Sequence, residues 1–290
     1  MFQGAMVAIV TPFKEGRVDE AALRELVEFQ IAGGTDAIIP CGTTGESATL
    51  SHDEHNQVVD IVVDAVAGRV PVIAGAGSNN TAEAIHLTRH AKEAGADGVL
   101  LITPYYNKPS QEGLYQHFKA IAESVEIPML LYNVPGRTSV DLLPATVGRL
   151  SELPNIVGIK EATGSIQRAS EVIEMSRPDF DLLSGDDFTF FAQMCVGGKG
   201  VISVSANVAP ELVAGIYDDF QAGDWPAAAA KNRKLQKLAR AMFYETNPVP
   251  VKTALALMGR IGEELRLPLA PLAAENRARL EAVLREYELL

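Results

Sequence analysis

The segment Ile156-Val157-Gly158-Ile159-Lys160 decides the fold, because it is an apolar run without polar alternation that ends in a lysine. Near-continuous apolar runs are typical of parallel strands that are covered on both faces. Seven further runs of this kind occur along the chain, at residues 5–10, 37–41, 70–74, 98–102, 128–132, 182–185 and 200–203. The sequence therefore predicts eight parallel strands.

Amphipathic stretches with helix start and stop signals separate these runs. Asp19 precedes a helical pattern that closes at Gly33-Gly34. Ser51 with Glu54 three residues later forms a capping box for the next helix, and a third helix runs from Thr81 to Gly95. Eight strands, each followed by a helix, predict the α/β class and a (β/α)8 TIM barrel. A doubly wound open sheet is the alternative, although it usually has fewer repeats.

The strand pattern stops after residue 222. Residues 225–243, 249–258 and 273–287 have helical patterns and are separated by breaks that contain proline. We expect a catalytic barrel domain over residues 1–222 and a C-terminal helical domain over residues 223–290.

Composition excludes several classes of function. The 290 residues are 47% hydrophobic, which is enough for a continuous buried core, and the formal net charge is −12. An acidic surface repels phosphates, so neither nucleic acid nor an anionic membrane is expected as a partner. No apolar run approaches the ~20 residues of a membrane span.

The two cysteines, Cys41 and Cys195, both lie in apolar runs and outside any CxxC pattern. Two thiols are too few for a disulfide framework or a zinc site, and we interpret both as small core residues. The N-terminal residues lack the basic and apolar segments of a signal peptide. These features favour a cytoplasmic protein.

Polar residues follow the predicted strands at their carboxyl ends, where a barrel carries its active site. The most informative is Lys160. Desolvation at the barrel mouth disfavours an ammonium, and a neutral amine can attack a ketone to form an imine. The structural alternative is a salt bridge with Glu161, but adjacent residues on a strand point to opposite faces.

Tyr132 ends the preceding strand, so its side chain can converge with that of Lys160. Imine chemistry needs repeated proton transfer, and a phenol that is hydrogen-bonded to other hydroxyls can provide it. Thr43 and Tyr106 could extend such a relay. A tyrosine at a strand end that serves only in packing is the alternative interpretation.

Two segments are candidates for anion recognition. Residues 42–46 (Gly-Thr-Thr-Gly-Glu) lack the ending of a Walker motif and suit a carboxylate better than a phosphate. Arg137 offers a fork of donors, although a surface arginine without a role fits the spacing equally well. The five histidines form no metal-site pattern and no dinucleotide fingerprint is visible, so we expect neither a metal nor a cofactor.

Four segments together resemble the dihydrodipicolinate synthase family, within the pyruvate-dependent class I aldolase or N-acetylneuraminate lyase superfamily. They are residues 42–47 (GTTGES), 103–107 (TPYYN), 132–138 (YNVPGRT) and 158–164 (GIKEATG). The resemblance extends from Phe2 to the C-terminal helices and includes residues 247–252 (NPVPVK). Their order and spacing make the match specific.

The resemblance implies a lyase of lysine (diaminopimelate) biosynthesis that condenses pyruvate, as a Schiff base on a lysine, with L-aspartate-4-semialdehyde. It implies a homotetramer, a dimer of tight dimers, in which Tyr106 reaches across from a neighbouring subunit. The implied roles are the imine for Lys160, the relay for Tyr132, Thr43 and Tyr106, the pyruvate carboxylate for Thr44, the aldehyde carboxylate for Arg137, and the pocket lining for Gly185 and Ile202.

The same resemblance implies an allosteric cleft for L-lysine at the dimer interface. The residues that match it are Ser47, Ala48, His52, His55, Asn79, Glu83 and Tyr105. A carboxylate with an aromatic ring is reasonable chemistry for an amino-acid ligand. We therefore expect feedback inhibition by L-lysine.

Two rival functions remain. N-acetylneuraminate lyase or a 2-keto-3-deoxy-sugar-acid aldolase would share the imine lysine, but a sugar acid does not require the guanidinium of Arg137. A non-catalytic lysine sensor would lose Lys160 or Tyr132, and both are present.

Overall fold

The computed structural model describes residues 1–290, which form two compact units. The first unit comprises residues 1–4 and 71–202, and the second comprises residues 5–70 and 203–290. None of the helices is both long enough and apolar enough to span a membrane.

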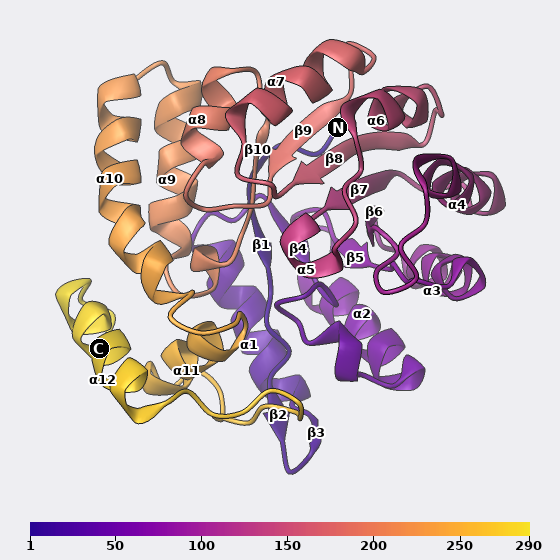
Figure 1. Ribbon diagram of the computed structural model, residues 1–290. Helices are drawn as coiled ribbons and strands as arrows, with labels where there is room; N and C mark the ends of the chain where they lie inside the picture. The colour runs from indigo at the N-terminus through magenta and orange to yellow at the C-terminus, as the bar shows by residue number, and fades with distance from the viewer. The chain divides into compact units, whose positions relative to one another are not determined.

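The first unit alternates strands and helices (Figure 1). Its strands lie in the order β10-β9-β8-β7-β6-β5, and all neighbours are parallel. The strands are β5 (Ile73–Gly75), β6 (Gly98–Ile102), β7 (Met129–Asn133), β8 (Ile156–Glu161), β9 (Asp181–Ser184) and β10 (Gly200–Ser203). The helices are α3 (Thr81–Ala94), α4 (Gln111–Ser124), α5 (Pro135–Thr138), α6 (Pro144–Ser151), α7 (Ile166–Met175) and α8 (Phe190–Cys195).

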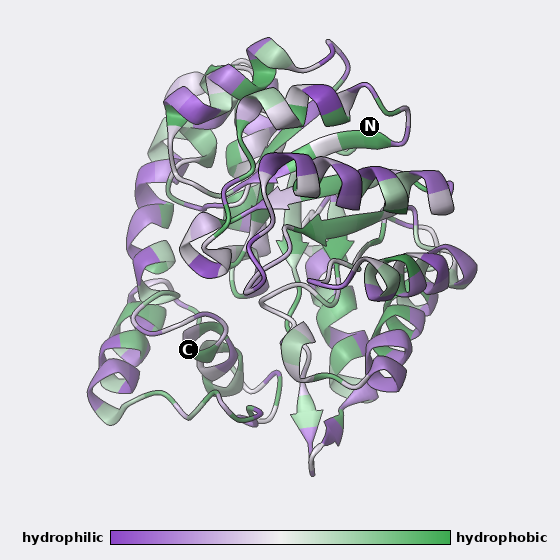
Figure 2. Cartoon of the chain, turned by 45° about the vertical axis from the view of Figure 1, so that its right-hand side comes forward, coloured by the Kyte–Doolittle hydropathy of each residue, from purple (hydrophilic) through white to green (hydrophobic).

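The helices of the first unit explain why its strands are mostly apolar on both faces. Parallel neighbours require a crossover connection, and here that connection is helical. Helix α3 packs on β6, α6 on β8 and α7 on β9. All six residues of β8 are buried, including its two charged ones. Figure 2 shows strands coloured mostly as hydrophobic and helices that alternate hydrophobic and hydrophilic residues.

The second unit contains the other two predicted parallel strands, β1 (Gly4–Ala8) and β4 (Ala37–Ile39), which pair with each other. A short antiparallel hairpin, β2 (Phe13–Lys14) and β3 (Arg17–Val18), was not predicted. The helices are α1 (Glu20–Ala32), η1 (Ser47–Thr49), α2 (His52–Val66), η2 (Ser205–Asn207), α9 (Pro210–Gln221), α10 (Trp225–Ala241), α11 (Val249–Leu257) and α12 (Ala274–Glu286).

The predicted helix signals are confirmed. The Asp19 side chain accepts from the backbone of α1, and the capping box of Ser51 and Glu54 opens α2. Helix α3 begins at Thr81 as predicted, with Asn80 as its cap, and ends at Gly95 in a left-handed conformation. The three C-terminal helices α10, α11 and α12 are present, while the domain boundary at residue 222 stays a prediction.

The two cysteines differ in environment. Cys41 is buried, as predicted, and burial raises the pKa of its thiol. Cys195 is exposed, so the prediction of a core residue there was wrong. It is the last residue of α8, a helix of six residues whose buried positions are Phe190, Gln193 and Met194. An apolar run does not reveal which side of so short a helix faces inward.

Candidate active site

Lys160 and Tyr132 form the centre of the candidate site. They lie opposite each other in the register of β8 and β7, so their side chains leave the sheet on the same face. Both are only 6% exposed, and Lys160 Nζ lies 4.3 Å from the centroid of the Tyr132 ring. The convergence predicted from the strand ends is therefore present.

The environment of Lys160 makes its amine available in the neutral form. Burial lowers the pKa of Lys160 to about 7, the nearby Asp187 carboxylate acts in the opposite direction, and the Arg137 guanidinium lowers it further. The structure shows no ion pair for Lys160, and Glu161 makes its hydrogen bonds elsewhere. The amine is therefore populated without a proton near neutral pH, as nucleophilic attack requires.

Gly185 follows β9 directly and leaves room for the lysine. A Cβ atom at this position would lie 3.1 Å from Cε and 3.2 Å from Cγ of Lys160, and 2.6 Å from Cβ of Ala162. The neighbouring strand β10 contributes Ile202, which is 1% exposed. Only glycine at position 185 therefore allows the end of β9 to approach the lysine this closely.

Arg137 and Tyr106 are the exposed members of the predicted catalytic and substrate-binding set in the first unit. Arg137 lies in α5, directly after β7, and its charge reaches Lys160. Tyr106 is 88% exposed and has a left-handed backbone with φ of 67°. A non-glycine residue in that region carries strain, and an aromatic ring held in solvent is suited to contact another molecule.

Thr43 and Thr44 lie in the second unit, in the loop that follows β4. Thr44 is buried, and its hydroxyl oxygen accepts a hydrogen bond of 3.0 Å from Asn247 Nδ2. The Thr11 hydroxyl donates to the carbonyl of Gly45 in the same loop, at 2.7 Å. The hydroxyl-bearing segment is therefore held by one contact at Thr44 itself and one at the neighbouring Gly45.

A buried ion pair fixes the end of this loop. Glu46 has a left-handed backbone, and its carboxylate accepts from Lys252 Nζ at 2.5 Å and from the Arg266 backbone at 3.1 Å. Both side chains of the Glu46–Lys252 pair are almost fully buried. In the sequence, Lys252 stands out only through the family resemblance, since a lysine in a C-terminal helix gives no local sign of a buried partner.

The residues predicted for lysine binding fall into two groups. In the first unit, the carbonyl of Asn79 accepts from the Asn107 side chain at 2.8 Å, and Ser78 donates to Glu83. Burial and then the Glu83 charge raise the pKa of Tyr105, so these two side chains lie near each other. In the second unit, Ser47 and Ala48 lie in η1, and His52 and His55 lie on the following α2.

Asp187 and Asn133 were not predicted as site residues. Asp187 is 2% exposed, and its charge acts on Lys160. Asn133 follows Tyr132 and is fully buried. The sequence places polar residues at the carboxyl ends of all the predicted strands, and it gives no ground to select these two among them.

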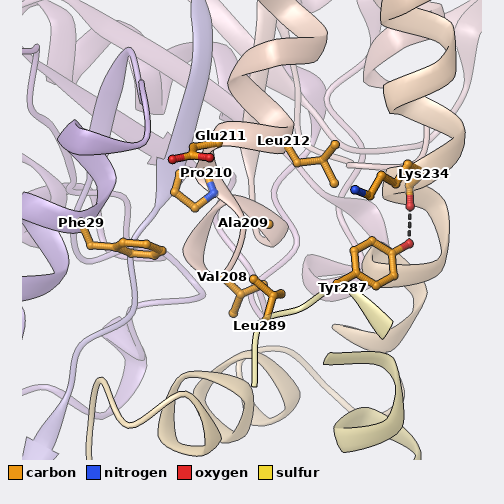
Figure 3. Close-up of a pocket in the computed structure, with 9 residues that line it drawn as sticks. All are labelled: Phe29, Val208, Ala209, Pro210, Glu211, Leu212, Lys234, Tyr287 and Leu289. Carbon is orange, nitrogen blue, oxygen red and sulfur yellow. Dashed lines mark hydrogen bonds between the residues drawn. The ribbon is translucent and has the colours of Figure 1, made fainter. Parts of the chain in front are cut away.

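A cavity of about 250 Å³ in the second unit lies apart from these residues (Figure 3). The rings of Phe29 and Tyr287 face it, with Pro210 and Leu289 between them, and the Tyr287 hydroxyl donates to the carbonyl of Lys234. None of the predicted site residues lines it.

Comparison with known proteins identifies similar sequences over the whole chain. The sequence profile of the dihydrodipicolinate synthetase family matches residues 1–287. A 4-hydroxy-tetrahydrodipicolinate synthase of Trichlorobacter lovleyi is 62% identical over 290 residues, and one of Geotalea uraniireducens is 61% identical, each covering 100% of both chains.

Solved structures show the same likeness. Dihydrodipicolinate synthase from Aquifex aeolicus matches with a TM-score of 0.98 and 49% identity, covering 99% of each chain. The chloride-inhibited enzyme from Acinetobacter baumannii, complexed with pyruvate, matches with a TM-score of 0.98 and 49% identity over 100% of both chains. The enzyme from Cyanidioschyzon merolae with lysine bound is 40% identical, with a TM-score of 0.97, covering 100% and 99%. These matches confirm the predicted (β/α)8 fold class with C-terminal helices.

Proposed function

This chain belongs to the dihydrodipicolinate synthetase family, and we propose that it acts as a 4-hydroxy-tetrahydrodipicolinate synthase. In this reaction, pyruvate condenses with L-aspartate-4-semialdehyde in the lysine and diaminopimelate pathway. Relatives at 61–62% identity over their full length carry this name, and a similar solved enzyme holds pyruvate.

The observation that carries the mechanism is the buried amine of Lys160 beside the Tyr132 ring. The neutral amine attacks the keto carbon of pyruvate, and loss of water from the carbinolamine gives an imine. The protonated imine withdraws electrons, so the methyl carbon of the bound pyruvate loses a proton and the imine becomes an enamine. The enamine carbon then attacks the aldehyde carbon: a carbon–carbon bond forms, the carbonyl π bond breaks, its oxygen takes a proton, and the imine to Lys160 is regenerated. Attack of water or of the product's own amino group on this imine releases the Lys160 amine.

The remaining residues of the predicted site complete this mechanism. Tyr132, Thr43 and Tyr106 relay the protons that imine formation and breakdown require. Thr44 holds the pyruvate carboxylate and Arg137 that of the aldehyde, while Gly185 and Ile202 line the pocket. The exposure of Arg137 in α5 and the proximity of its charge to Lys160 support its role at the mouth of the site.

The assembly that we propose is a cytoplasmic homotetramer, a dimer of tight dimers, in which Tyr106 enters the site of a neighbouring subunit. Its 88% exposed ring and strained backbone support this role, because neither is explained by packing within its own chain. We also propose that residues 1–222 form the catalytic barrel domain and residues 223–290 a C-terminal helical domain.

L-lysine is the proposed feedback inhibitor, bound by Ser47, Ala48, His52, His55, Asn79, Glu83 and Tyr105. A similar solved enzyme holds lysine. The Glu83 carboxylate and the Tyr105 ring, which is 39% exposed, offer a charge and an apolar surface for an aliphatic ammonium ion.

Borohydride trapping with pyruvate, followed by mass spectrometry of the peptides, tests the function. We expect a reduced adduct on Lys160 and none on Lys252, which is equally buried but ion-paired to Glu46. Turnover with L-aspartate-4-semialdehyde and not with sugar aldehydes would identify the second substrate. A folded protein that gives no adduct at Lys160 would refute the mechanism.

A further inference from the structure

Two polar residues lie directly behind the catalytic pair. Asn133 follows Tyr132 and Glu161 follows Lys160, and these two pairs are adjacent in the register of β7 and β8. Because neighbouring residues on a strand point to opposite faces, Asn133 and Glu161 project away from the amine and the phenol. Both are 0% exposed.

Asn133 uses both of its amide donors and its carbonyl acceptor in this position. Its Nδ2 donates to Glu161 Oε2 at 3.1 Å and to Asp141 Oδ1 at 3.0 Å, and its Oδ1 accepts from the Leu142 backbone at 3.0 Å. An asparagine side chain that serves β8 and the loop after α5 at once holds both to the end of β7.

The other members of this network are satisfied too. Glu161 Oε1 accepts from the Thr163 backbone at 2.7 Å. Arg168 binds both oxygens of Asp141, at 2.7 and 3.0 Å. The Arg168 guanidinium lowers the pKa of the Asp141 carboxyl, so this pair stays charged. Asn133 and Glu161 are buried, whereas Asp141 and Arg168 are partly exposed. A network whose buried members are all paired rigidifies the backbone that carries it.

We propose that Asn133, Glu161 and Asp141 are positioning residues that fix Lys160 and Tyr132 for imine formation. The network joins the ends of both catalytic strands to the segment 134–142, which carries Arg137. It therefore sets where three groups of the reaction stand relative to one another. This inference rests on the proposed function.

Asn133→Asp tests the proposal, because it keeps the shape of the side chain but replaces the donor by an acceptor that faces two carboxylates. Asn155→Asp is the matched control. Asn155 lies at the opposite end of the same strand pair, donates to the carbonyls of Ala122 and Val125, and contacts no proposed site residue. Both substitutions convert a donor amide into a carboxylate.

The measurement is the rate constant for imine formation with pyruvate, by rapid mixing and borohydride quench, across pH 5–9. It is made at a temperature where circular dichroism shows each variant to be folded. For Asn133→Asp we expect the rate constant for imine formation to fall at least about tenfold and the midpoint of its pH profile to shift. For Asn155→Asp we expect the wild-type pH midpoint and a rate constant within about twofold of the wild type, since Asn155 lies at the strand end away from the lysine.

Glu161→Gln provides a second variant if Asn133→Asp does not fold. Its new amide group meets the amide of Asn133, so one hydrogen bond is lost, and the expected change has the same direction but is smaller. The proposal is overturned if folded variants at both positions keep the wild-type rate and pH midpoint, or if Asn155→Asp changes both to the same extent. A wild-type protein that forms no imine would instead overturn the proposed function.

Discussion

Replacing Gly185 by alanine tests the packing around the catalytic lysine. The new Cβ would lie 2.6 Å from Ala162 Cβ, whereas ordinary contact begins at 3.4 Å, so the end of β9 must move away from β8 by about 0.8 Å. The Lys160 side chain, at 3.1 and 3.2 Å, must also shift by a few tenths of an ångström.

The expected cost follows from these distances. Overpacking of this kind destabilises by about 1–3 kcal/mol. A misplacement approaching 1 Å at reacting groups can reduce the rate by about 100-fold, and we expect kcat/KM to fall by about 30- to 100-fold. Steady-state kinetics with pyruvate and L-aspartate-4-semialdehyde, and urea unfolding followed by circular dichroism, measure the two effects.

Gly215→Ala in α9 is the control for this substitution. Its Cβ would meet only the end of the Lys231 side chain, at 3.0–3.4 Å, and that end can move. We expect unchanged kinetics and a stability change within about 1 kcal/mol, because alanine favours the helix. If Gly185→Ala retained kcat/KM within threefold of the wild type, the close approach of β9 would not be what places Lys160.

Three further changes test other parts of the site. Asp187→Asn removes the charge that raises the pKa of Lys160, so the midpoint of imine formation in a pH–rate profile should move from about 7 to lower pH. An upward shift would contradict the effect ascribed to Asp187. Lys252→Met leaves the buried Glu46 carboxylate without its ion-pair partner and should lower the free energy of unfolding in urea by about 3–5 kcal/mol. The double variant with Glu46→Gln should recover most of this loss. Glu83→Gln should raise the L-lysine concentration for half-inhibition at least about tenfold while kcat stays constant, and unchanged inhibition would exclude Glu83 from the lysine site.

The sequence was sufficient to predict the eight parallel strands because their burial on both faces leaves continuous apolar runs. The hairpin β2–β3 escaped prediction because two residues per strand are too few to show any periodicity. Cys195 was misassigned for a related reason. In a helix as short as α8, hydrophobicity does not define an inward face.

The candidate site was predictable where a residue conflicts with its surroundings. Lys160 at the end of an apolar strand is such a conflict, and its chemistry followed directly. Asn133 and Glu161 gave no such signal, because polar residues at strand ends have an ordinary explanation. Asp141, which accepts from Asn133, is eight residues beyond it, and Arg168 is 27 beyond Asp141, so only the folded chain brings the network together.

The two buried lysines of this chain have different roles: Lys252 is ion-paired and structural, and Lys160 is the proposed nucleophile. Lys252 is paired with Glu46, and although burial lowers its pKa, the carboxylate opposes that effect and the pair fixes a loop. Lys160 has no such pair, and burial lowers its pKa from 10.5 to about 7. Between these two values the unfolded chain binds more protons than the folded one. Stability should therefore rise with pH across that window, and below pH 7 the full cost of burying the Lys160 ammonium, a few kcal/mol, is present.

Lys160→Met removes this cost and should stabilise the protein while abolishing imine formation, which urea unfolding at pH 6 and borohydride trapping would measure. A variant no more stable than the wild type would mean that the Lys160 ammonium is solvated in the folded state. Lys160 would then stay protonated near neutral pH and would not be a neutral nucleophile.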